Sequence, residues 1–277
     1  MLQHTFCHIP SLGLTTEVRL WQAGIRVWED AAGCDAWPCS ARIASRIREY
    51  VHLSSSRYAE GDAAWFAERL PGSQAWRLFA DFRDRTAFVD IETTGLSPGS
   101  DAVTTIALYD GRQVRTYVQG RNLDAFAADI AAYALLVTYN GKSFDIPFLS
   151  RSLDLSFPQA HLDLRYVLGA LGMKGGLKGC EQCAGLDRGM LVGVDGWDAV
   201  RLWRAYERSG DEAVLQTLLA YNVEDVLSLE YLATLAYNRH LAQTPFAASR
   251  ALDLPRPGLN PCRADPLVLE RLHQGQL

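Results

Sequence analysis

The sequence has no apolar run long enough to cross a membrane. No stretch approaches the ~18–20 residues that a spanning helix needs. The start of the chain, MLQHTFCHIP, lacks the charged and then apolar segments of a signal peptide. We therefore expect a soluble protein of the cytoplasm that makes no contact with a membrane.

Cysteine is sparse. The six cysteines are scattered over 277 residues without a secretory signal, which excludes a disulfide framework. Cys180 and Cys183 form a CxxC pair that could bind zinc. A zinc site needs a second pair of ligands, however, and Cys34 and Cys39 match that requirement only loosely. The alternative is that Cys180 and Cys183 are small core residues of a helix.

An excess of basic charge is missing too. The chain has 32 Asp and Glu against 27 Lys and Arg, which gives a net charge of −5. This argues against a broad basic face that grips duplex DNA, but not against a nuclease, because bound metal ions reverse the local sign of charge. The densest basic region holds Arg42, Arg46, Arg48 and Arg57. It is either a solvated helix face or a surface that steers phosphate toward a site.

Hydrophobic residues make up 48% of the chain, enough to build a sizeable core. We divide the sequence into a helical N-terminal region (1–80), an α/β domain (81–242) and a proline-rich tail (243–277). Apolar residues recur at helical spacing over residues 18–25 and again over residues 40–70.

The N-terminal segment HIPSLGLTTEVRLWQAGI resembles a degenerate helix-hairpin-helix element, which binds DNA phosphates through backbone amides. Gly13 fits the hairpin, whereas Ser11 stands where its first glycine would be. Contact with DNA and simple structural packing are both open for this segment.

Strand and helix patterns alternate in the α/β domain. RTAFVDIE, AVTTIALYD and RQVRTYVQG predict three strands, and the last two are joined by a tight Asp110-Gly111 hairpin. A short helix over 124–133, a strand at ALLVTYN, helices at FDIPFLSRSL and RYVLGAL, and a long helix over 212–235 follow. This order predicts an α/β fold whose mixed sheet has three antiparallel strands and then parallel strands, flanked by helices.

Two acidic residues interrupt the apolar pattern of FVDIETTGL (88–96). Side chains of a strand alternate between its faces, so Asp90 and Glu92 point the same way. Two ionised carboxylates that close repel each other and are costly to bury. A divalent cation removes that cost, and hard carboxylate oxygens suit Mg²⁺ or Mn²⁺. The alternative is a pair of acids that face the solvent.

Two later segments also carry acids. TYNGKSFDIPFL (138–149) leaves a strand and begins a helix near Asp145, where the helix dipole alone favours an acid. In YNVEDVLSLEYL (221–232), Tyr221 and Asp225 are four residues apart and share a helix face. The apolar stripe of that helix passes beside Asp225, which then faces either the interior or the solvent.

Together the three segments resemble the motifs of the DEDD (DnaQ-like) 3′–5′ exonuclease superfamily, whose members have an RNase H-like fold. Its first motif, D-x-E-T-T-G-L, is matched by DIETTGL, and its second, N-x-x-x-F-D-x-x-F-L, by NGKSFDIPFL. The third is Y-x-x-x-D in the tyrosine subclass, matched by YNVED. The histidine subclass has His five residues before the aspartate, where this sequence has Ala220, so the tyrosine subclass fits better.

A narrower resemblance is to the YprB-type RNase H-like family, over roughly residues 85–240. HLDLRYVL (161–168) matches the D-L segment of that family. GLKGCE stands where the family has S-L-K-x-x-E, with Gly176 in place of the serine. Asp163, in the D-L segment, is a weaker site candidate because it could equally be a loop acid.

The resemblance implies a 3′–5′ exonuclease that hydrolyses phosphodiester bonds with two divalent cations, Mg²⁺ or Mn²⁺. It assigns metal binding to Asp90, Glu92, Asp145 and Asp225, and a catalytic role to these four together with Tyr221. The tyrosine is implied to orient the attacking water, because a phenol with an ordinary pKa near ~10 is a poor base at neutral pH.

The resemblance also implies the substrate and its contacts. The expected substrate is the 3′ end of single-stranded DNA or RNA, with DNA favoured and DNA repair as the expected setting. The residues expected to touch its terminal nucleotide are Thr93, Thr94, Gly95, Leu96, Asn140 and Phe144. Gly95 is expected to give the terminal base or sugar room.

Two other functions compete with this one. A glycosidase also uses paired carboxylates, but it explains Asp90 and Glu92 without explaining the third motif. A catalytically inactive nucleic-acid-binding or scaffold protein on the same fold is the alternative to an enzyme. The intact set of four acids and one tyrosine argues against it.

Overall fold

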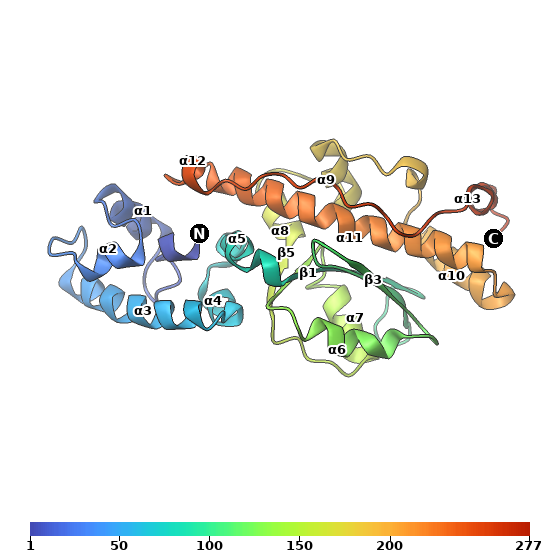
Figure 1. The fold of residues 1–277 in the computed structure, drawn as a ribbon, viewed down its shortest axis with the longest axis horizontal. Coiled ribbons are helices and arrows are strands. Elements are labelled where there is room, and N and C mark those ends of the chain that lie inside the picture. The colour runs from blue at the N-terminus through green and yellow to red at the C-terminus, as the bar shows by residue number, and fades with distance from the viewer.

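A five-stranded mixed sheet lies at the centre of the computed structural model, which describes residues 1–277 (Figure 1). The strands are β1 (Thr86–Thr93), β2 (Val103–Tyr109), β3 (Val114–Val118), β4 (Leu135–Thr138) and β5 (Ala160–Asp163). They lie in the order β3-β2-β1-β4-β5. The first three pair antiparallel, and β4 and β5 continue the sheet in parallel. This confirms the predicted fold class, three antiparallel strands followed by parallel ones.

Helices cover the sheet on both faces. In chain order they are α6 (Phe126–Ile130), α7 (Asp145–Ser152), α8 (Leu164–Gly169), α9 (Gly176–Ala184), α10 (Gly196–Ser209) and α11 (Glu212–Leu241), with short 3-10 turns η4 (Leu123–Ala125) and η5 (Gly189–Leu191). In Figure 1, α11 runs along one side of the sheet, and α6 and α7 lie on the other.

Successive side chains of β1 point to opposite faces of the sheet, and each face packs into a different hydrophobic core. Val89 and Ile91 belong to the core that α6 and α7 share with the sheet. Phe88 belongs to the larger core, which includes the apolar residues of α11. Asp90 and Glu92 follow Phe88 in steps of two residues, so they lie on the α11 side of β1.

Most of the helices and strands predicted for the α/β domain are present, but several begin or end at other residues than predicted. The helix expected over 124–133 starts as the 3-10 turn η4, and its α-helical part ends at Ile130. The long helix ends at Leu241, six residues beyond the predicted Leu235. The edge strand β5 was not predicted, because AHLD has only two apolar residues, whereas the equally short β4, LLVT, is a continuous apolar run.

The N-terminal region is helical. Its elements are η1 (Leu2–His4), α1 (Leu14–Gln22), α2 (Trp28–Ala32), α3 (Ala41–Ala59), α4 (Ala63–Arg69), η2 (Gly72–Arg77), α5 (Leu78–Phe82) and η3 (Arg83–Arg85). The helix predicted over 18–25 begins earlier, at Leu14. It ends before Gly24, which has a φ of +89° and so takes the chain out of helical geometry.

A buried ion pair ties the start of the chain to the segment before the sheet. The Arg77 guanidinium donates to both oxygens of the Glu17 carboxylate at 2.8 Å. The same carboxylate accepts the backbone N–H groups of Phe6 and Cys7. The larger core also contains residues of both the N-terminal region and α11. The division at residue 80 is therefore a boundary of sequence pattern and not of the core, and the three-part division stays a prediction.

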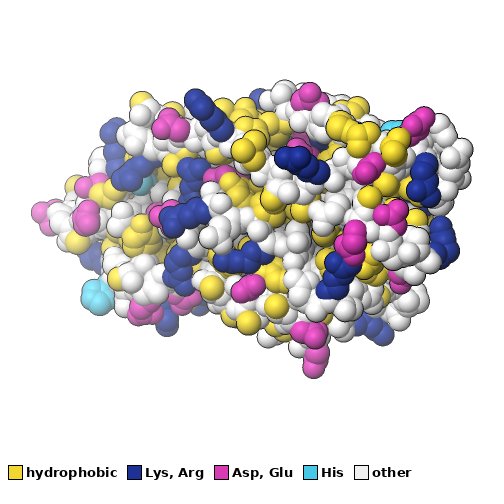
Figure 2. Space-filling view, turned by 45° about the vertical axis from the view of Figure 1, so that its right-hand side comes forward, with side chains coloured by type: hydrophobic (Ala, Val, Ile, Leu, Met, Phe, Trp, Pro, Cys, Tyr) yellow, Lys and Arg dark blue, Asp and Glu magenta, His cyan; other side chains and the backbone are white.

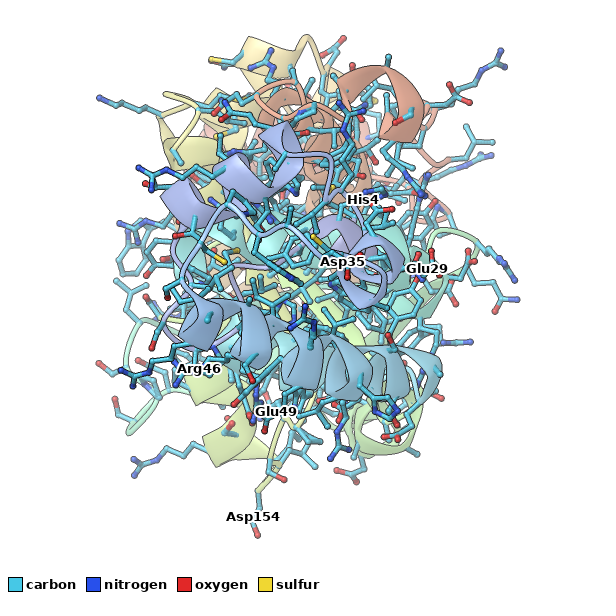
Figure 3. All side chains as sticks on the ribbon, turned by 90° about the vertical axis from the view of Figure 1, so that its left-hand side faces the viewer. His4, Glu29, Asp35, Arg46, Glu49 and Asp154 are labelled. Carbon is cyan, nitrogen blue, oxygen red and sulfur yellow. The ribbon has the colours of Figure 1, made fainter.

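The segment that resembles a helix-hairpin-helix element packs against α3. A three-residue 3-10 turn, η1, lies where the first helix of such an element would be. Arg46 of α3, labelled in Figure 3, donates to the carbonyl of Pro10 and to the Ser11 hydroxyl in the hairpin. The hairpin is thus held by contacts inside the region, and contact with DNA stays a prediction.

Two other arginines of α3 also make contacts within the N-terminal region. Arg48 donates to the carbonyl of Cys34, and Arg57 pairs with Glu60. Figure 1 shows α3 in the N-terminal part of the molecule, with α4 and α5 between it and β1. Of the two alternatives for these arginines, a solvated helix face and a surface that steers phosphate, neither is decided by these contacts.

The C-terminal tail is less irregular than its prolines indicated. It holds the short α12 (Ala247–Arg250) and a second helix, α13 (Pro266–His273). Proline occupies the first position of α13, where a missing N–H costs nothing, and Asp265 caps the helix. Leu269 and Leu272 bury this helix in a small core shared with α10 and α11. Among all these helices, none combines the length and apolar composition that a membrane crossing needs.

Candidate metal centre

Three carboxylates from distant parts of the chain meet where α11 crosses β1. One oxygen from each of Asp90, Glu92 and Asp225 lies within 4.8 Å of the others. Glu92 and Asp225 are buried and Asp90 is partly buried. The register of β1 with β2 shifts between Glu92 and Thr93, a bulge of the kind that often redirects strand residues beside active sites. The inward alternative for Asp225 is therefore the one that the fold adopts.

The three acids are difficult to ionise together. Burial raises the pKa of Asp90 and of Glu92 well above their ordinary ranges, and the carboxylate of Asp225 adds to both shifts. Burial also raises the pKa of Asp225 to about 6, although the Arg188 guanidinium opposes that shift. A positive charge placed among the three would relieve this repulsion.

Asp145 lies beside this group without belonging to it. It is buried at the first position of α7, and its oxygens lie outside the set that falls within 4.8 Å. Burial raises its pKa to about 7, with a further contribution from Asp163, while hydrogen bonding from the backbone of Asp145 itself and of Ile91 opposes the rise. Of the four predicted metal ligands, the structure brings three together and holds the fourth nearby.

Asn222 orients Asp90. Its side-chain N–H group donates to Oδ2 of Asp90 at 2.7 Å, and its carbonyl accepts the hydroxyl of Thr105 at 3.0 Å. Asn222 and Thr105 are fully buried, so neither group can bond to water instead. No sequence motif drew attention to Asn222. The signal that could have found it is its position four residues before Val226, which places a polar side chain on the apolar stripe of α11.

Arg188 holds Asp225. Its Nε and Nη2 donate to the Glu181 carboxylate at 2.5 and 2.7 Å, and Nη2 also pairs with Oδ1 of Asp225. Its Nη1 is buried and has no hydrogen-bond partner in the chain. Arg188 lies in the loop after α9, seven residues after Glu181 of the GLKGCE segment, and the sequence alone assigned it no role.

Tyr221 lies one turn before Asp225 on α11 and is buried. The Lys178 ammonium is 5.0 Å from its ring centroid, and the centre of the Arg188 guanidinium is 5.9 Å away. Burial, and then the charge of Asp225, raise the pKa of the phenol above its ordinary value. The hydroxyl therefore keeps its proton at neutral pH.

The loop after β1 is closed by its own side chains. Thr93 Oγ1 donates to the carbonyl of Gly95 at 2.5 Å, and Thr94 Oγ1 donates to Asp101 at 3.4 Å. A Cβ atom at Gly95 would lie only 2.6–2.7 Å from the Asp101 carboxylate. Asp101 thus occupies the side of Gly95 to which a side chain would point, and the contact of Gly95 with a terminal base or sugar stays a prediction.

The turn after β4 is fixed by Asp163. This buried carboxylate accepts the backbone N–H groups of Asn140, Lys142 and Arg165 at 2.8–3.0 Å. Asn140 has a φ of +67°, and its side-chain oxygen accepts Arg165 Nη1 at 2.5 Å. Asp163 is therefore a structural acid that shapes this turn, the alternative that the sequence left open for it.

A small cavity adjoins the carboxylates. Its volume is about 260 Å³, and its lining residues are Glu92, Thr93, Gly95, Leu96, Phe144, Asp195, Gly196, Trp197 and Val200. The cavity contains four of the six residues expected to contact a terminal nucleotide. Asn140 and Thr94 are not in its lining.

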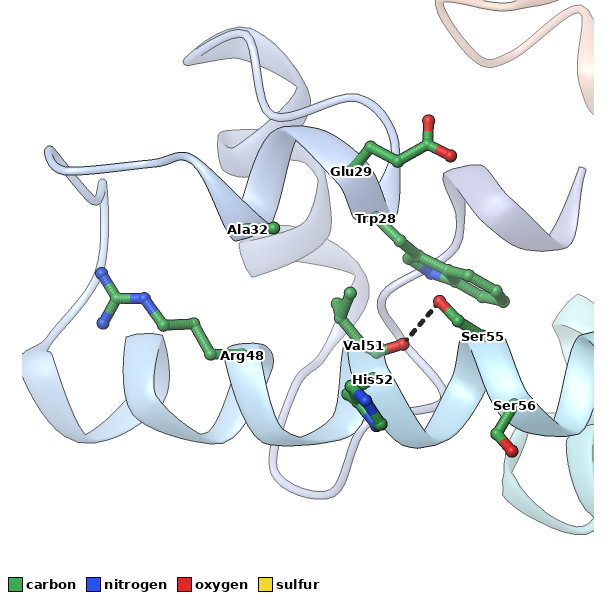
Figure 4. Close-up of a pocket in the computed structure, with 8 residues that line it drawn as sticks. All are labelled: Trp28, Glu29, Ala32, Arg48, Val51, His52, Ser55 and Ser56. Atoms are coloured by element: carbon green, nitrogen blue, oxygen red, sulfur yellow. Dashed lines mark hydrogen bonds between the residues drawn. The ribbon is translucent and has the colours of Figure 1, made fainter.

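A larger cavity, of about 540 Å³, lies between α2 and α3 in the N-terminal region (Figure 4). Trp28 and Val51 line it, with Ser55, whose hydroxyl donates to the Val51 carbonyl at 2.9 Å. Its lining includes no pair of acids, and it is remote in the chain from the carboxylates. Of these two cavities, only the smaller one is lined by one of the three clustered carboxylates, Glu92.

The two cysteines of the CxxC pair lie on α9, as the helical alternative predicted, but only Cys180 is a core residue. Cys180 is buried and Cys183 is exposed. The one group of acids, histidines and cysteines compact enough to hold a metal ion is Asp90, Glu92 and Asp225. That set offers only carboxylate oxygens, which fit a hard divalent cation such as Mg²⁺ or Mn²⁺.

The part of the chain that builds this centre matches a known family. Residues 87–237, more than half of the chain, match the RNase H superfamily. The chain belongs to the RNase H superfamily. Both elements that supply the carboxylates of this RNase H-like domain, β1 and α11, lie almost entirely in the matched range. None of the curated proteins compared with the chain matches it.

Several solved structures are similar to this RNase H-like chain. One is a family B DNA polymerase from Pyrobaculum calidifontis, at 19% identity and a TM-score of 0.42 over 61% of this chain and 27% of the polymerase. Another is a nuclease in its apo form, at 20% identity and 0.43 over 59% and 76%. A third is Brucella melitensis NrnC with bound Mg²⁺, at 18% identity and 0.41 over 58% and 76%. The chain thus spans about a quarter of the polymerase's length.

Proposed function

We propose that this protein is a metal-dependent 3′–5′ exonuclease of the DEDD superfamily, in its tyrosine subclass and of the YprB type. The observation that carries the proposal is the meeting of Asp90, Glu92 and Asp225 within 4.8 Å, with Tyr221 one turn before Asp225. A nuclease of the RNase H superfamily needs such a carboxylate set to bind the cations that act on phosphate. The cytoplasm is its proposed location.

In this proposal Asp90, Glu92 and Asp225 bind divalent cations directly, and Asp145 holds the second one, directly or through water. When bound, the cations lower the pKa of the attacking water and offset the charge that develops on the phosphate. Mg²⁺ and Mn²⁺ both suit these oxygen ligands.

The chain's own groups position the reaction. The Tyr221 hydroxyl, which keeps its proton, donates a hydrogen bond to the attacking water and fixes its direction toward phosphorus. Water then displaces the 3′ oxygen of the preceding nucleotide, and a nucleoside monophosphate leaves. The terminal nucleotide rests in the cavity beside Glu92, where Leu96 and Phe144 are among the contacts.

The proposed substrate is a free 3′ end of single-stranded nucleic acid, DNA rather than RNA, and DNA repair is the proposed setting. The charge distribution is consistent with an end-binding enzyme. Figure 2 shows basic and acidic side chains interspersed over one face, without a broad basic area for duplex DNA. A small cavity beside the carboxylates suits one terminal nucleotide better than a continuous backbone.

One observation favours the alternative, an inactive nucleic-acid-binding protein. The ion pair between Arg188 and Asp225 engages Oδ1, one of the two oxygens of Asp225 that could bind a cation. If the pair persisted in the presence of metal ions, only Oδ2 of Asp225 would be left for them. An inactive protein would bind nucleic acid without cleaving it.

The test is digestion of a 5′-labelled single-stranded oligonucleotide by the full chain in Mg²⁺ or Mn²⁺. We expect the wild-type protein to shorten it stepwise from a free 3′ end and to leave a blocked 3′ end intact. Asp90→Ala should abolish digestion. Asp84→Ala, which removes an exposed acid in η3 just before β1, should leave digestion unchanged. Wild-type protein that binds the oligonucleotide without cleaving DNA or RNA would support the inactive alternative.

A further inference from the structure

The cavity beside Glu92 has a wall that no motif of the sequence assigns. Trp197 lines it from α10, and Leu96 lines it from the loop after β1. Both side chains are unusually open for large apolar groups, at 61% exposure for Trp197 and 68% for Leu96. An exposed apolar pair that faces a common cavity is the arrangement expected of a binding site for a flat ring.

Trp197 is exposed although its helix, α10, has a face that is packed in a hydrophobic core. The same helix buries Ala199, Leu202 and Trp203 on its inner face. Trp197 follows the capping residue Asp195, whose carboxylate accepts its backbone N–H at 2.8 Å. The indole N–H makes no hydrogen bond within the chain, so the fold fixes the backbone of Trp197 and leaves its ring free.

The lining of the cavity selects against phosphate. None of its nine residues is basic, and two of them, Glu92 and Asp195, are acidic. A phosphate group would be repelled there, whereas an uncharged aromatic ring would not. The volume of about 260 Å³ is below the ~300–1,000 Å³ of pockets for drug-sized ligands, which suits one ring system.

We propose that Trp197 forms a stacking wall for the base of the terminal nucleotide. This inference rests on the proposed nuclease function and adds a residue from outside the three acidic motifs. Leu96 lines the same cavity, and the phosphate of the nucleotide would lie outside it, on the side of the carboxylates of Asp90, Glu92 and Asp225. Because every base has a π-face, stacking tolerates all four bases, and the enzyme should show little preference for the terminal base.

The test is binding of a 5′-fluorescent single-stranded oligodeoxythymidine, measured by anisotropy in Ca²⁺ so that cleavage is slow. A second oligonucleotide ends in an abasic 3′ residue. Stacking contributes ~1–3 kcal/mol per base, so Trp197→Ala should weaken binding of the normal end roughly 5- to 150-fold. The same variant should bind the abasic end as the wild type does.

Two further variants make the result specific. Trp197→Phe keeps an aromatic face and should retain most of the affinity for the normal end. Val192→Ala changes an apolar side chain of similar exposure, 62%, that is not in the cavity lining, and should behave as the wild type with both oligonucleotides.

Equal binding of the normal end by Trp197→Ala and the wild type would overturn the proposal. So would an equal loss of binding with normal and abasic ends, because Trp197 would then act on the fold or the backbone and not on the base. A failure of the nuclease proposal looks different: the wild type fails to shorten any oligonucleotide in Mg²⁺ or Mn²⁺, whatever the anisotropy result.

Discussion

The amide of Asn222 donates a 2.7 Å hydrogen bond to Oδ2 of Asp90, from the helix that also carries Asp225. One turn of α11 therefore supplies one carboxylate of the centre and the group that orients another. Thr105 on β2 fixes the amide in turn. The chain joins the sheet to α11 through this buried relay, so the position of the centre depends on the packing of the two.

Asn222→Ala should impair catalysis without unfolding the protein. Loss of a group that orients a metal ligand typically costs about 10–100-fold in metal affinity or activity. We expect a loss of kcat in that range and a higher Mg²⁺ concentration at half-maximal rate. Titration of the rate with Mg²⁺ checks this, and the metal dependence is a readout that a purely structural role would not change.

Thr105→Val is the matched control for Asn222→Ala. It removes the outer bond of the relay and leaves the bond between Asn222 and Asp90. A smaller loss is expected from it. If Asn222→Ala showed the wild-type rate and the wild-type Mg²⁺ dependence, Asn222 would have no part in positioning Asp90.

Arg188→Met should destabilise the folded protein. The change leaves the buried carboxylates of Glu181 and Asp225 without their cation, and removal of one partner from a buried ion pair typically costs about 3–5 kcal/mol. Urea unfolding in the absence of divalent cations measures the loss. Adding Glu181→Gln to Arg188→Met should recover part of the stability, because one of the unpaired charges is gone.

The exposed pair of Arg121 and Glu212 gives the comparison. Arg121→Met should change the free energy of unfolding by no more than about 1 kcal/mol, because exposed ion pairs are screened by solvent. If Arg188→Met and Arg121→Met lowered the free energy of unfolding by similar amounts, the ion pairs of Arg188 would contribute no more than an exposed pair.

The stability of the folded protein should depend on pH, and the stabilising effect of Mg²⁺ should depend on pH as well. Burial raises the pKa of Asp145 to about 7 and of Asp225 to about 6, against about 3.9 for an unfolded aspartate. Each therefore binds its proton more tightly in the folded chain. The stability that these protons contribute is fully present below about pH 4 and is lost as the pH rises toward 7.

Mg²⁺ should counter this loss because it favours the ionised carboxylates. We expect the rise in Tm on adding Mg²⁺ to be larger at pH 8 than at pH 5, and to be smaller in Asp225→Asn than in the wild type. Thermal unfolding at both pH values checks it. An equal rise at pH 5 and pH 8 would contradict a cation site made of these acids.

Local sequence pattern located the acidic pairs but left each open between the interior and the solvent, and only the resemblance to three exonuclease motifs joined them into one site. Asp90 and Glu92 share a face because strand residues alternate, and Tyr221 and Asp225 share one because they are four apart on a helix. These periods are properties of each segment alone. The order of strands and helices predicted the mixed sheet for the same reason.

Local pattern could not find what depends on contacts between distant segments. Arg188 and Trp197 lie in or next to loops, and only the packing of α9 and α10 beside β1 brings them to the site. Nor could local pattern show that the Asp101 carboxylate fills the space to which a side chain at Gly95 would point. Helix α13 was missed because the prolines around it masked an apolar stripe that matters only against α10 and α11.

The central claim is that Asp90, Glu92 and Asp225 together bind divalent cations. Its most direct test is anomalous diffraction from crystals of the full chain grown with Mn²⁺. The account predicts anomalous peaks within ligand distance of these three carboxylates, and release of Asp225 from Arg188. The claim would be contradicted if crystals grown with Mn²⁺ showed no anomalous peak at the three carboxylates and kept the ion pair between Arg188 and Asp225.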